Sequence, residues 1–177
     1  MTAIVGGKAW SNWTSYEVDA DVLTPAAAWS LQVANPSSAQ IAAVTEGSAI
    51  TLMVGPVTIL TGWIDQKTFR SSRQGDVLAL SGRDHAAPLV DCSVPLDWNF
   101  RNIPFRALAL QAMAALGVVA DLVVDDEAEG PVAHAHPEPG ETFWEMMERL
   151  AKPLRVMEWT SAGQIRIGRP SYTSLPT

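Results

Sequence analysis

The stretch Ser81-Gly82-Arg83-Asp84-His85-Ala86-Ala87-Pro88-Leu89-Val90-Asp91-Cys92-Ser93 separates a strand-rich first part of the sequence from a second part that contains helices. Residues 77–80, just before it, are aliphatic and β-branched, which predicts a strand, and Gly82 permits a bulge at the end of that strand. Pro88 excludes a central strand directly afterwards. The sequence therefore predicts that a strand ends here and that the chain crosses tightly into a second unit.

Arg83, Asp84 and His85 within this stretch raise the question of an active site. Adjacent residues of an extended chain point to opposite faces, so their side chains are not expected to converge on a substrate. An Arg–Asp pair beside a backbone bend more often holds a loop against neighbouring backbone. We expect Arg83 and Asp84 to set the geometry of the crossing, and we assign no catalytic residue here.

The composition is that of an acidic globular protein. The chain has 177 residues, 47% of them hydrophobic, which is enough to bury the core of one domain or of two small ones. A formal net charge of −7 disfavours specific nucleic-acid binding, which needs clustered Lys and Arg. The longest nearly apolar run, residues 107–120, is too short to cross a bilayer, and no secretory leader opens the sequence. We therefore expect no stable membrane insertion and synthesis in a cytoplasm.

Residues 1–90 are predicted to form an antiparallel β-barrel domain. Apolar and polar residues alternate at 15–22 and 29–33, and turn residues separate further strands at 50–54, 57–65 and 76–81. Five or six short strands with a turn about every ten residues favour a closed or nearly closed barrel, although a β-sandwich fits the same pattern.

Some positions in this first part need separate statements. Trp29 and Trp63 occupy apolar strand positions and are predicted to fill the core. Trp10 and Trp13 lie in an irregular leader that folds over a barrel end or meets a neighbouring subunit. Residues 41–44 fit either a short helix or a strand, and residues 70–75 are predicted to be a polar loop.

Residues 91–170 are predicted to form a small α+β domain with two helices and a terminal hairpin. The first helix follows Pro104 and ends at Gly117. The second begins with a capping box of Thr142 and Glu145 and ends at Pro153.

The remaining segments of this part are a strand at 118–124 and a hairpin of residues 154–159 and 164–167. Residues 121–141 contain seven acidic residues and no Lys or Arg, which predicts a solvated connection with little regular structure. On the second helix we expect the i, i+4 ion pairs Glu145–Arg149 and Glu148–Lys152. Residues 171–177 are predicted to be a tail or linker.

The search for chemistry yields no assigned catalytic, cofactor or metal site. His134 and His136 form a His-x-His pair near several carboxylates, but no third histidine or cysteine cluster accompanies them, so no metal is assigned. Cys92, the only cysteine, would be a nucleophile only with His85 against it, and we expect a buried, inert thiol. An enzyme is therefore the minority interpretation.

Several segments together resemble a known family. Gly82-Arg83-Asp84 and Leu89-Val90-Asp91-Cys92-Ser93 are similar to a signature of baseplate hub proteins of contractile phage tails, the Mu-like tail protein family. Thr61-Gly62-Trp63-Ile64-Asp65, Phe100-Arg101-Asn102-Ile103 and Pro139-Gly140-Glu141-Thr142-Phe143-Trp144-Glu145 fit the same family in order and spacing. No single motif is specific, but the ordered set covers nearly the whole chain and resembles the N-terminal half of such proteins.

The resemblance implies a tail-tube-like barrel and a structural role without enzymatic activity or cofactor. It implies a homotrimer whose barrels form a ring in the virion tail baseplate, joining the membrane-piercing tail spike protein to the tail tube or tape-measure protein. A phage-derived tail-like particle fits equally well. Glu17, Asp19 and Asp21 are candidates for the lumen of that ring, with the solvated outside as the alternative. The competing hypothesis is a tail-associated peptidoglycan hydrolase whose site is lined by residues 121–141.

Overall fold

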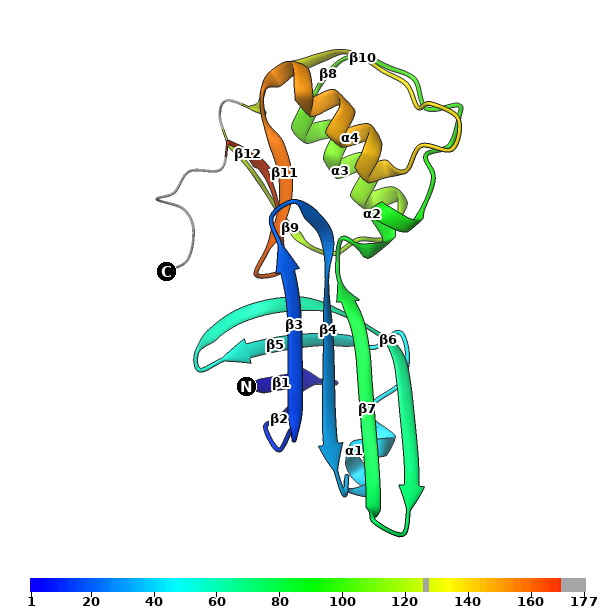
Figure 1. Cartoon of the computed structure of the whole chain (residues 1–177). Coiled ribbons are helices and arrows are strands. Elements are labelled where there is room, and N and C mark those ends of the chain that lie inside the picture. Colours follow the sequence, from blue (N-terminus) through cyan, green and yellow to red (C-terminus); the bar gives the residue numbers. More distant parts are fainter. Residues whose placement is uncertain (126–127, 170–177) are drawn as a thin grey trace. The chain divides into compact units, whose positions relative to one another are not determined.

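The computed structural model describes residues 1–125 and 128–169, and the chain forms two compact units (Figure 1). Unit 1 consists of Met1–His85 together with Ser161–Gly163, and unit 2 consists of Ala86–Thr160 and the chain from Gln164 onward. The predicted tail at 171–177 lies outside the described residues. The mainly β character with a few helices is confirmed.

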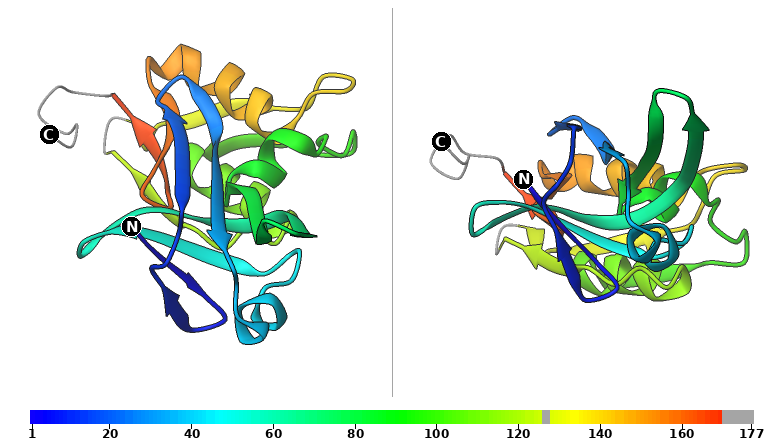
Figure 2. Two further views of the ribbon diagram at one scale, coloured as in Figure 1. Left: turned by 60° about the horizontal axis from the view of Figure 1, so that its bottom comes forward. Right: turned by 90° about the horizontal axis from the view of Figure 1, so that it is seen from below.

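Unit 1 is built around one antiparallel sheet of seven strands in the order β2-β1-β5-β6-β7-β4-β3. The strands are β1 (Thr2–Val5), β2 (Lys8–Trp10), β3 (Ser15–Asp21), β4 (Thr24–Ala34), β5 (Ala49–Val54), β6 (Val57–Ser72) and β7 (Gly75–Asp84). Strand β6 pairs with β5 through residues 57–63 and with β7 through residues 62–72, and the β6–β7 ladder has a register shift between Ile64 and Gln66. As Figures 1 and 2 show, β5 crosses the long strands β3, β4 and β7, so the sheet folds over on itself.

The core of unit 1 lies between the two halves of the folded sheet. Every second residue of β4 and β7 points into it, as alternation along a strand requires. Its buried members come from both halves and are Ala3, Val5, Ala27, Trp29, Leu31, Val33, Val44, Ile50, Leu52, Leu60, Ile64, Leu78 and Leu80. Helix α1 (Ser38–Ala43) begins with a capping box of Ser37 and Gln40, which decides the open question at residues 41–44 in favour of a helix.

Several expectations for unit 1 are corrected. The predicted irregular leader is the β1–β2 hairpin, because Gly6 and Gly7 take the positive φ values that a two-residue turn needs. The predicted polar loop at 70–75 is mostly strand, since β6 and β7 pair as far as Ser72 and Gly75. Strands β2 and β3 are the two edges of the sheet, and no ladder joins them in the described part of the chain, so a closed barrel is not confirmed.

Two side-chain predictions in unit 1 also fail. Trp63 is only partly buried, because it stands opposite Arg83 on the face that points away from the core, whereas Trp29 is 3% exposed as predicted. The apolar phase of β3 does not cover a core: Tyr16 is 57% exposed, and only Val18 packs against the buried cluster. An edge strand has fewer neighbours to pack against than a central one.

Unit 2 combines helices with two small sheets. Its elements are α2 (Ala87–Asp91), β8 (Phe100–Pro104), α3 (Phe105–Ala115), β9 (Asp121–Val124), β10 (Pro131–Ala135), α4 (Phe143–Ala151), a 3-10 turn η2 (Lys152–Leu154), β11 (Met157–Ser161) and β12 (Gln164–Gly168). Strands β8 and β10 pair antiparallel, while β11, β12 and β9 form a three-stranded sheet in which β12 and β9 are parallel. The buried faces of α3 and α4 meet in one apolar cluster that includes Phe105, Leu108, Phe143 and Met146.

The two predicted helices and the terminal hairpin are present, with shifted limits. The first strand of the hairpin starts at Met157, later than residue 154, because η2 continues the chain past α4. The connection at 121–141 is more regular than predicted, since it contains both β9 and β10. Asp126 and Glu127 of that connection lie outside the described residues. Within the described residues, no helix has the length and apolar character needed to cross a membrane.

Candidate functional site

The most extensive surface feature of unit 1 is the side of strands β3, β4, β7 and β6 that points away from the core. We call it the outer face. Its residues are Ser15, Glu17, Asp19, Ala28, Ser30, Gln32, Gln66, Thr68, Arg70, Val77, Ala79, Ser81 and Arg83. Most of these side chains are short and uncharged, which makes the face smooth and polar.

The strand register places these residues in rows across four strands. Glu17 stands opposite Ser30, Ser30 opposite Ser81, and Ser81 opposite Gln66. Of the charged residues on the face, Glu17 and Asp19 are on edge strand β3, Arg70 is on β6, and Arg83 is near the end of β7. Apart from Arg83, the middle of the face, formed by β4 and β7, carries uncharged side chains.

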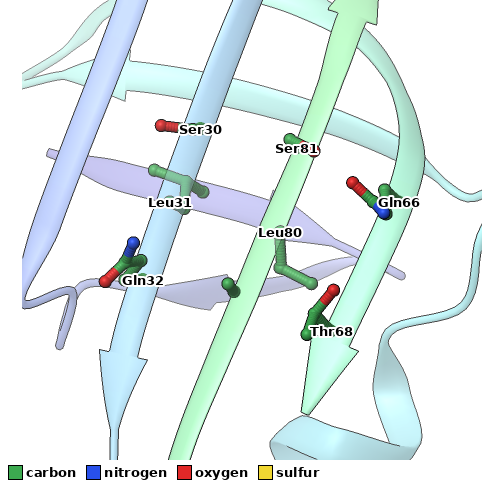
Figure 3. A pocket seen from close by; sticks show the side chains of 8 residues that line it. Ser30, Leu31, Gln32, Gln66, Thr68, Leu80 and Ser81 are labelled. Atoms are coloured by element: carbon green, nitrogen blue, oxygen red, sulfur yellow. The ribbon is translucent and has the colours of Figure 1, made fainter. Parts of the chain in front are cut away.

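Three shallow hollows follow this face, with volumes of about 110, 240 and 360 Å³. The smallest lies over the middle, and Figure 3 shows Ser30, Gln32, Gln66, Thr68 and Ser81 around it. These side chains offer hydroxyl and amide groups, but none of them is an acid, base or nucleophile arranged for catalysis. The arrangement suits contact with another surface better than it suits chemistry.

Two glycines hold the strands of unit 1 close together near the bend of β6. A Cβ at Gly82 would collide with the carbonyl oxygen of Trp63, and a Cβ at Gly62 would collide with the carbonyl oxygen of Arg83. Neither glycine has a positive φ, so backbone proximity alone explains them. Both glycines belong to the segments that carry the family resemblance. The close approach of the strands explains why glycine stands at these two positions.

The charged pair Arg83 and Asp84 lies in the same corner, on opposite sides of the sheet. Arg83 Nε is 3.1 Å from Asp65 Oδ2, and both side chains are partly exposed. Asp84 is only 4% exposed, and its Oδ2 accepts a hydrogen bond of 3.2 Å from the backbone N–H of Ala27. Asp84 thus ties β7 to β4 from the inside, while Arg83 ties β7 to the bend of β6 from the outside.

His85 and Cys92 do not form a catalytic pair. His85 packs edge-to-face on Trp63 with ring centroids 5.0 Å apart, and its backbone N–H donates to the carbonyl of Thr61. Burial lowers the pKa of His85 more strongly than the neighbouring Asp84 raises it, so the imidazole is neutral at pH 7. Cys92 is exposed, which corrects the expectation of a buried thiol; it follows the short helix α2 and faces solvent.

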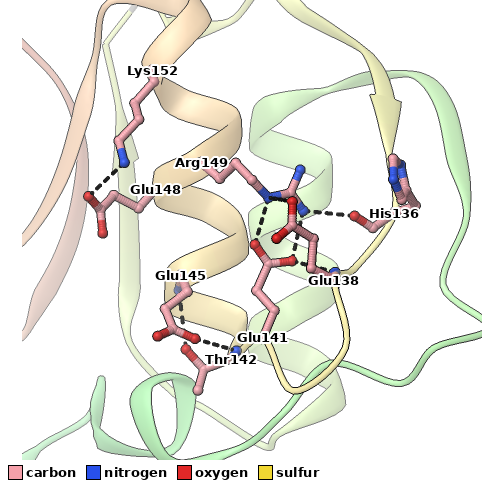
Figure 4. Close-up of polar contacts among 8 residues, drawn as sticks. All are labelled: His136, Glu138, Glu141, Thr142, Glu145, Glu148, Arg149 and Lys152. Atoms are coloured by element: carbon pink, nitrogen blue, oxygen red, sulfur yellow. Dashed lines mark hydrogen bonds and ion pairs between the residues drawn. The ribbon is translucent and has the colours of Figure 1, made fainter.

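In unit 2 the polar residues are concentrated around the start of α4 (Figure 4). Thr142 and Glu145 form the predicted capping box. Arg149 does not pair with Glu145 as predicted, because the capping box occupies that carboxylate; it binds Glu141 instead, with Nε–Oε1 and Nη2–Oε2 distances of 2.6 and 2.7 Å. The predicted Glu148–Lys152 pair is present at 3.3 Å.

The Glu141–Arg149 pair closes the connection between β10 and α4. The Glu141 side chain is 8% exposed, and Arg149 also donates to the backbone carbonyl of His136 at 2.8 Å. Hydrogen bonding by Arg149 holds the pKa of Glu141 below its ordinary value, although burial opposes this. Three of the acidic residues in the segment considered as a hydrolase site have structural partners: Glu141 and Glu138 contact Arg149, and Glu129 binds Arg106 at 2.6 Å.

Glu158 on β11 is a buried acid that the sequence reasoning missed. It is 5% exposed, and neither carboxylate oxygen has a hydrogen-bond partner among the described residues. Burial raises the pKa of Glu158 to about 8, and the carboxylate of Glu148 adds to the shift. Its position between Met157 and Trp159 in an apolar strand was the only available signal.

Comparison with known proteins agrees with the order of the two units. Residues 1–84 match the family model of the Mu phage baseplate assembly protein GpP-like N-terminal domain. Residues 86–169 match the second domain of the baseplate hub protein gp44-like family. The two matches together cover almost all of the chain and meet at His85.

Individual relatives point the same way. The chain is 24% identical to the baseplate hub protein gp44 of Escherichia phage Mu over 98% of its own length and 47% of that protein. The 43 kDa tail protein of prophage MuSo2 from Shewanella oneidensis is 25% identical with a TM-score of 0.81, over 96% of this chain and 53% of that one. A tail protein from Neisseria meningitidis MC58 is 27% identical with a TM-score of 0.83, over 99% of this chain and 52% of that one.

The chain thus spans about half the length of the relatives that it matches. The matched domains are those of structural baseplate components, which is a non-enzymatic role. On the strength of two adjoining family matches in hub order, the chain belongs to the Mu-like baseplate hub proteins.

Proposed function

We propose that the chain is the ring-forming part of a phage tail baseplate hub, in which three copies join the membrane-piercing spike to the tail tube. The observation that carries the proposal is the unbroken succession of the two hub domains along residues 1–84 and 86–169. The protein acts in the virion tail after synthesis in the cytoplasm of the bacterial host. Its partners are two further copies, the spike protein, and the tail tube or tape-measure protein.

The outer face of unit 1 supports a role as the wall of a passage. A channel for a polyanionic genome must avoid clustered Lys and Arg, because these would bind phosphates and retain the strand. The middle of the outer face carries short uncharged side chains, and Glu17 and Asp19 lie along its β3 side. Asp21, the third candidate for the lumen, also accepts a hydrogen bond from the N–H of Leu23 in the β3–β4 turn.

Assembly is tested by measuring mass in solution. We expect light scattering to detect a trimeric complex when the chain is mixed with the spike and tube proteins of its own tail. A chain that stays monomeric and binds neither partner would contradict the hub role. Because the relatives are about twice as long, the chain alone is a weaker test than the mixture.

The passage is tested by reversing charge. In particles carrying Glu17→Lys and Asp19→Lys, we expect normal assembly but reduced genome delivery. Asp97→Lys and Asp121→Lys add the same charge at exposed positions outside the outer face and serve as the matched control. Equal delivery by both pairs of variants would place Glu17 and Asp19 on the outside of the ring.

A further inference from the structure

His134 and His136 bring two imidazole nitrogens together on the surface of unit 2. Their Nδ1 atoms are 3.2 Å apart, and the ring centroids are 5.3 Å apart at an interplanar angle of 71°. A neutral imidazole has one donor and one acceptor nitrogen, so this contact holds a single proton between two lone pairs. A metal ion is the other species that two converging lone pairs bind.

The backbone explains why both rings point the same way. Ala135 is 1% exposed and belongs to the apolar cluster of unit 2, so its two strand neighbours must point outward together. The β8–β10 register runs without a shift from Pro131–Pro104 to Ala135–Phe100. The buried side of β10 nevertheless changes between Val132 and Ala135, opposite the part of β8 where Asn102 has a φ of 50°.

The position of His136 is held by a second, independent set of contacts. Its carbonyl accepts a hydrogen bond of 2.8 Å from Arg149, which is itself bound to the nearly buried Glu141 (Figure 4). His134 is held by the pairing of its strand with β8. Both ligand positions are therefore fixed by the fold before any ion arrives, which reduces the ordering needed on binding.

We propose that His134 and His136 chelate one divalent transition-metal ion through their Nδ1 atoms. Imidazole ligands bind Zn²⁺ at about 2.0–2.1 Å, so two of them at a tetrahedral angle are separated by about 3.3 Å. The observed 3.2 Å matches that separation without a change in the backbone. Imidazoles select Zn²⁺, Ni²⁺ or Cu²⁺ over Mg²⁺ and Ca²⁺, which prefer oxygen ligands.

The site is a two-ligand chelate whose remaining positions are taken by water. In the described parts of the chain, no group of three or more His, Cys, Asp and Glu side chains is placed to hold an ion. Arg101 stands directly opposite His134 in the strand pair, and its positive charge opposes a cation. These two features predict exchangeable binding of moderate affinity.

The experiment is a Zn²⁺ titration of the untagged chain by calorimetry, in a Cys92→Ser background because the exposed thiol is a competing ligand. We expect one Zn²⁺ per chain. His134→Ala and His136→Ala should each weaken binding by at least about tenfold, since each leaves a single imidazole. Arg101→Ala should tighten it. Mg²⁺ should give no heat under the same conditions.

His85→Gln is the matched control, because it removes the third imidazole of the chain without touching the pair. Circular dichroism establishes that each variant is folded. Affinity that is unchanged in both pair variants, or that is lost in the His85 variant instead, overturns the proposal. So does the absence of binding by the folded Cys92→Ser protein at millimolar Zn²⁺.

Discussion

Units 1 and 2 are similar in size but use polar residues in opposite ways. In unit 1 the buried Asp84 accepts a hydrogen bond from the backbone of Ala27, and the outer face is left as a smooth polar surface. In unit 2 charged side chains tie the loops together, as Arg149 does for the connection before α4.

The two units therefore depend on different kinds of contact. Close backbone packing shapes unit 1, because the strands at the bend of β6 approach one another at Gly62 and Gly82. In unit 2 two acids of low exposure, Glu158 and Glu141, have opposite pKa shifts, so its stability should depend on pH. Substitutions that disturb close strand packing should therefore mainly affect unit 1, and substitutions of the buried acids should mainly affect unit 2.

The largest loss of stability is expected from Gly82→Ala. The new Cβ would meet the Trp63 carbonyl and lie 2.8 Å from Trp29 Cζ2, and a strand backbone cannot move aside cheaply. We expect a loss of at least ~3 kcal/mol in the free energy of unfolding, measured by urea denaturation. Hydrogen exchange should show the loss of protection in the strands of unit 1.

Gly130→Ala is the matched control in unit 2. Its added Cβ would lie 3.4 Å from Leu154 Cδ2, at the flexible end of a side chain, and its φ is not positive. We expect a change of less than ~1 kcal/mol, of either sign. Equal effects of the two substitutions would show that close strand packing is not what distinguishes unit 1.

The second prediction concerns Glu158→Gln in unit 2. The folded-state pKa of about 8 is above the ordinary value of 4.5, so the folded protein binds the extra proton between these values. Wild-type stability should then fall as the pH rises from about 5 through 8. The substitution should raise the free energy of unfolding by on the order of 3 kcal/mol at pH 7 and by little near pH 4.

Thermal unfolding of both proteins from pH 4 to pH 9 measures this difference. A constant difference across the range would mean that Glu158 is ionised in the fold and has found a partner. Glu148→Gln on α4 removes the second cause of the Glu158 pKa shift and should reduce the pH dependence only slightly.

A smaller change in the free energy of unfolding is expected from Glu141→Gln. The carboxylate pKa is lowered in the folded state, so its stabilising effect is present above the unfolded value and is lost as the pH falls through the folded value. We expect a loss of about 1–2 kcal/mol at pH 7 that disappears in acid, measured by urea denaturation at several pH values. A loss that persists undiminished at pH 3 would instead indicate altered packing.

Much of the fold could be predicted where a local pattern has a single interpretation. The alternation of β3 and β4, the capping box at Thr142 and the stop after α3 at Gly117 depend on nearby residues only. The β1–β2 hairpin and β10 were missed because their strands are short and because β1 and β10 are stabilised by partners distant in sequence.

The candidate site was harder to predict than the fold. Which face of an alternating strand is buried depends on the sheet, so Trp63 was assigned to the core although it stands on the side that points away from it. Tyr16 stands opposite the buried Leu31, but it is exposed because β3 is an edge strand. Helical spacing alone paired Arg149 with Glu145, although the same sequence placed Glu145 in the capping box; in the structure that box engages Glu145, and Arg149 binds Glu141. The convergence of His134 and His136 depends on the change of the buried side of β10 between Val132 and Ala135, near Asn102 with its positive φ.

The smallest effect on stability is expected from Arg83→Ala. Its ion pair with Asp65 joins side chains that are 37% and 43% exposed, and such surface pairs contribute less than ~1 kcal/mol. Asp84→Ala should destabilise more, because Asp84 is buried and accepts the Ala27 N–H. Comparing the two variants therefore distinguishes the stability contribution of a contact inside unit 1 from that of a contact on its outer face.

If the outer face contributes to the ring, Arg83→Ala should weaken assembly with the spike and tube proteins while the melting temperature changes by only a few degrees. Light scattering of the mixture and a thermal melt of the chain measure these two quantities separately. A variant that matches the wild type in both would show that Arg83 is ordinary solvated surface and that the assembly contacts lie elsewhere.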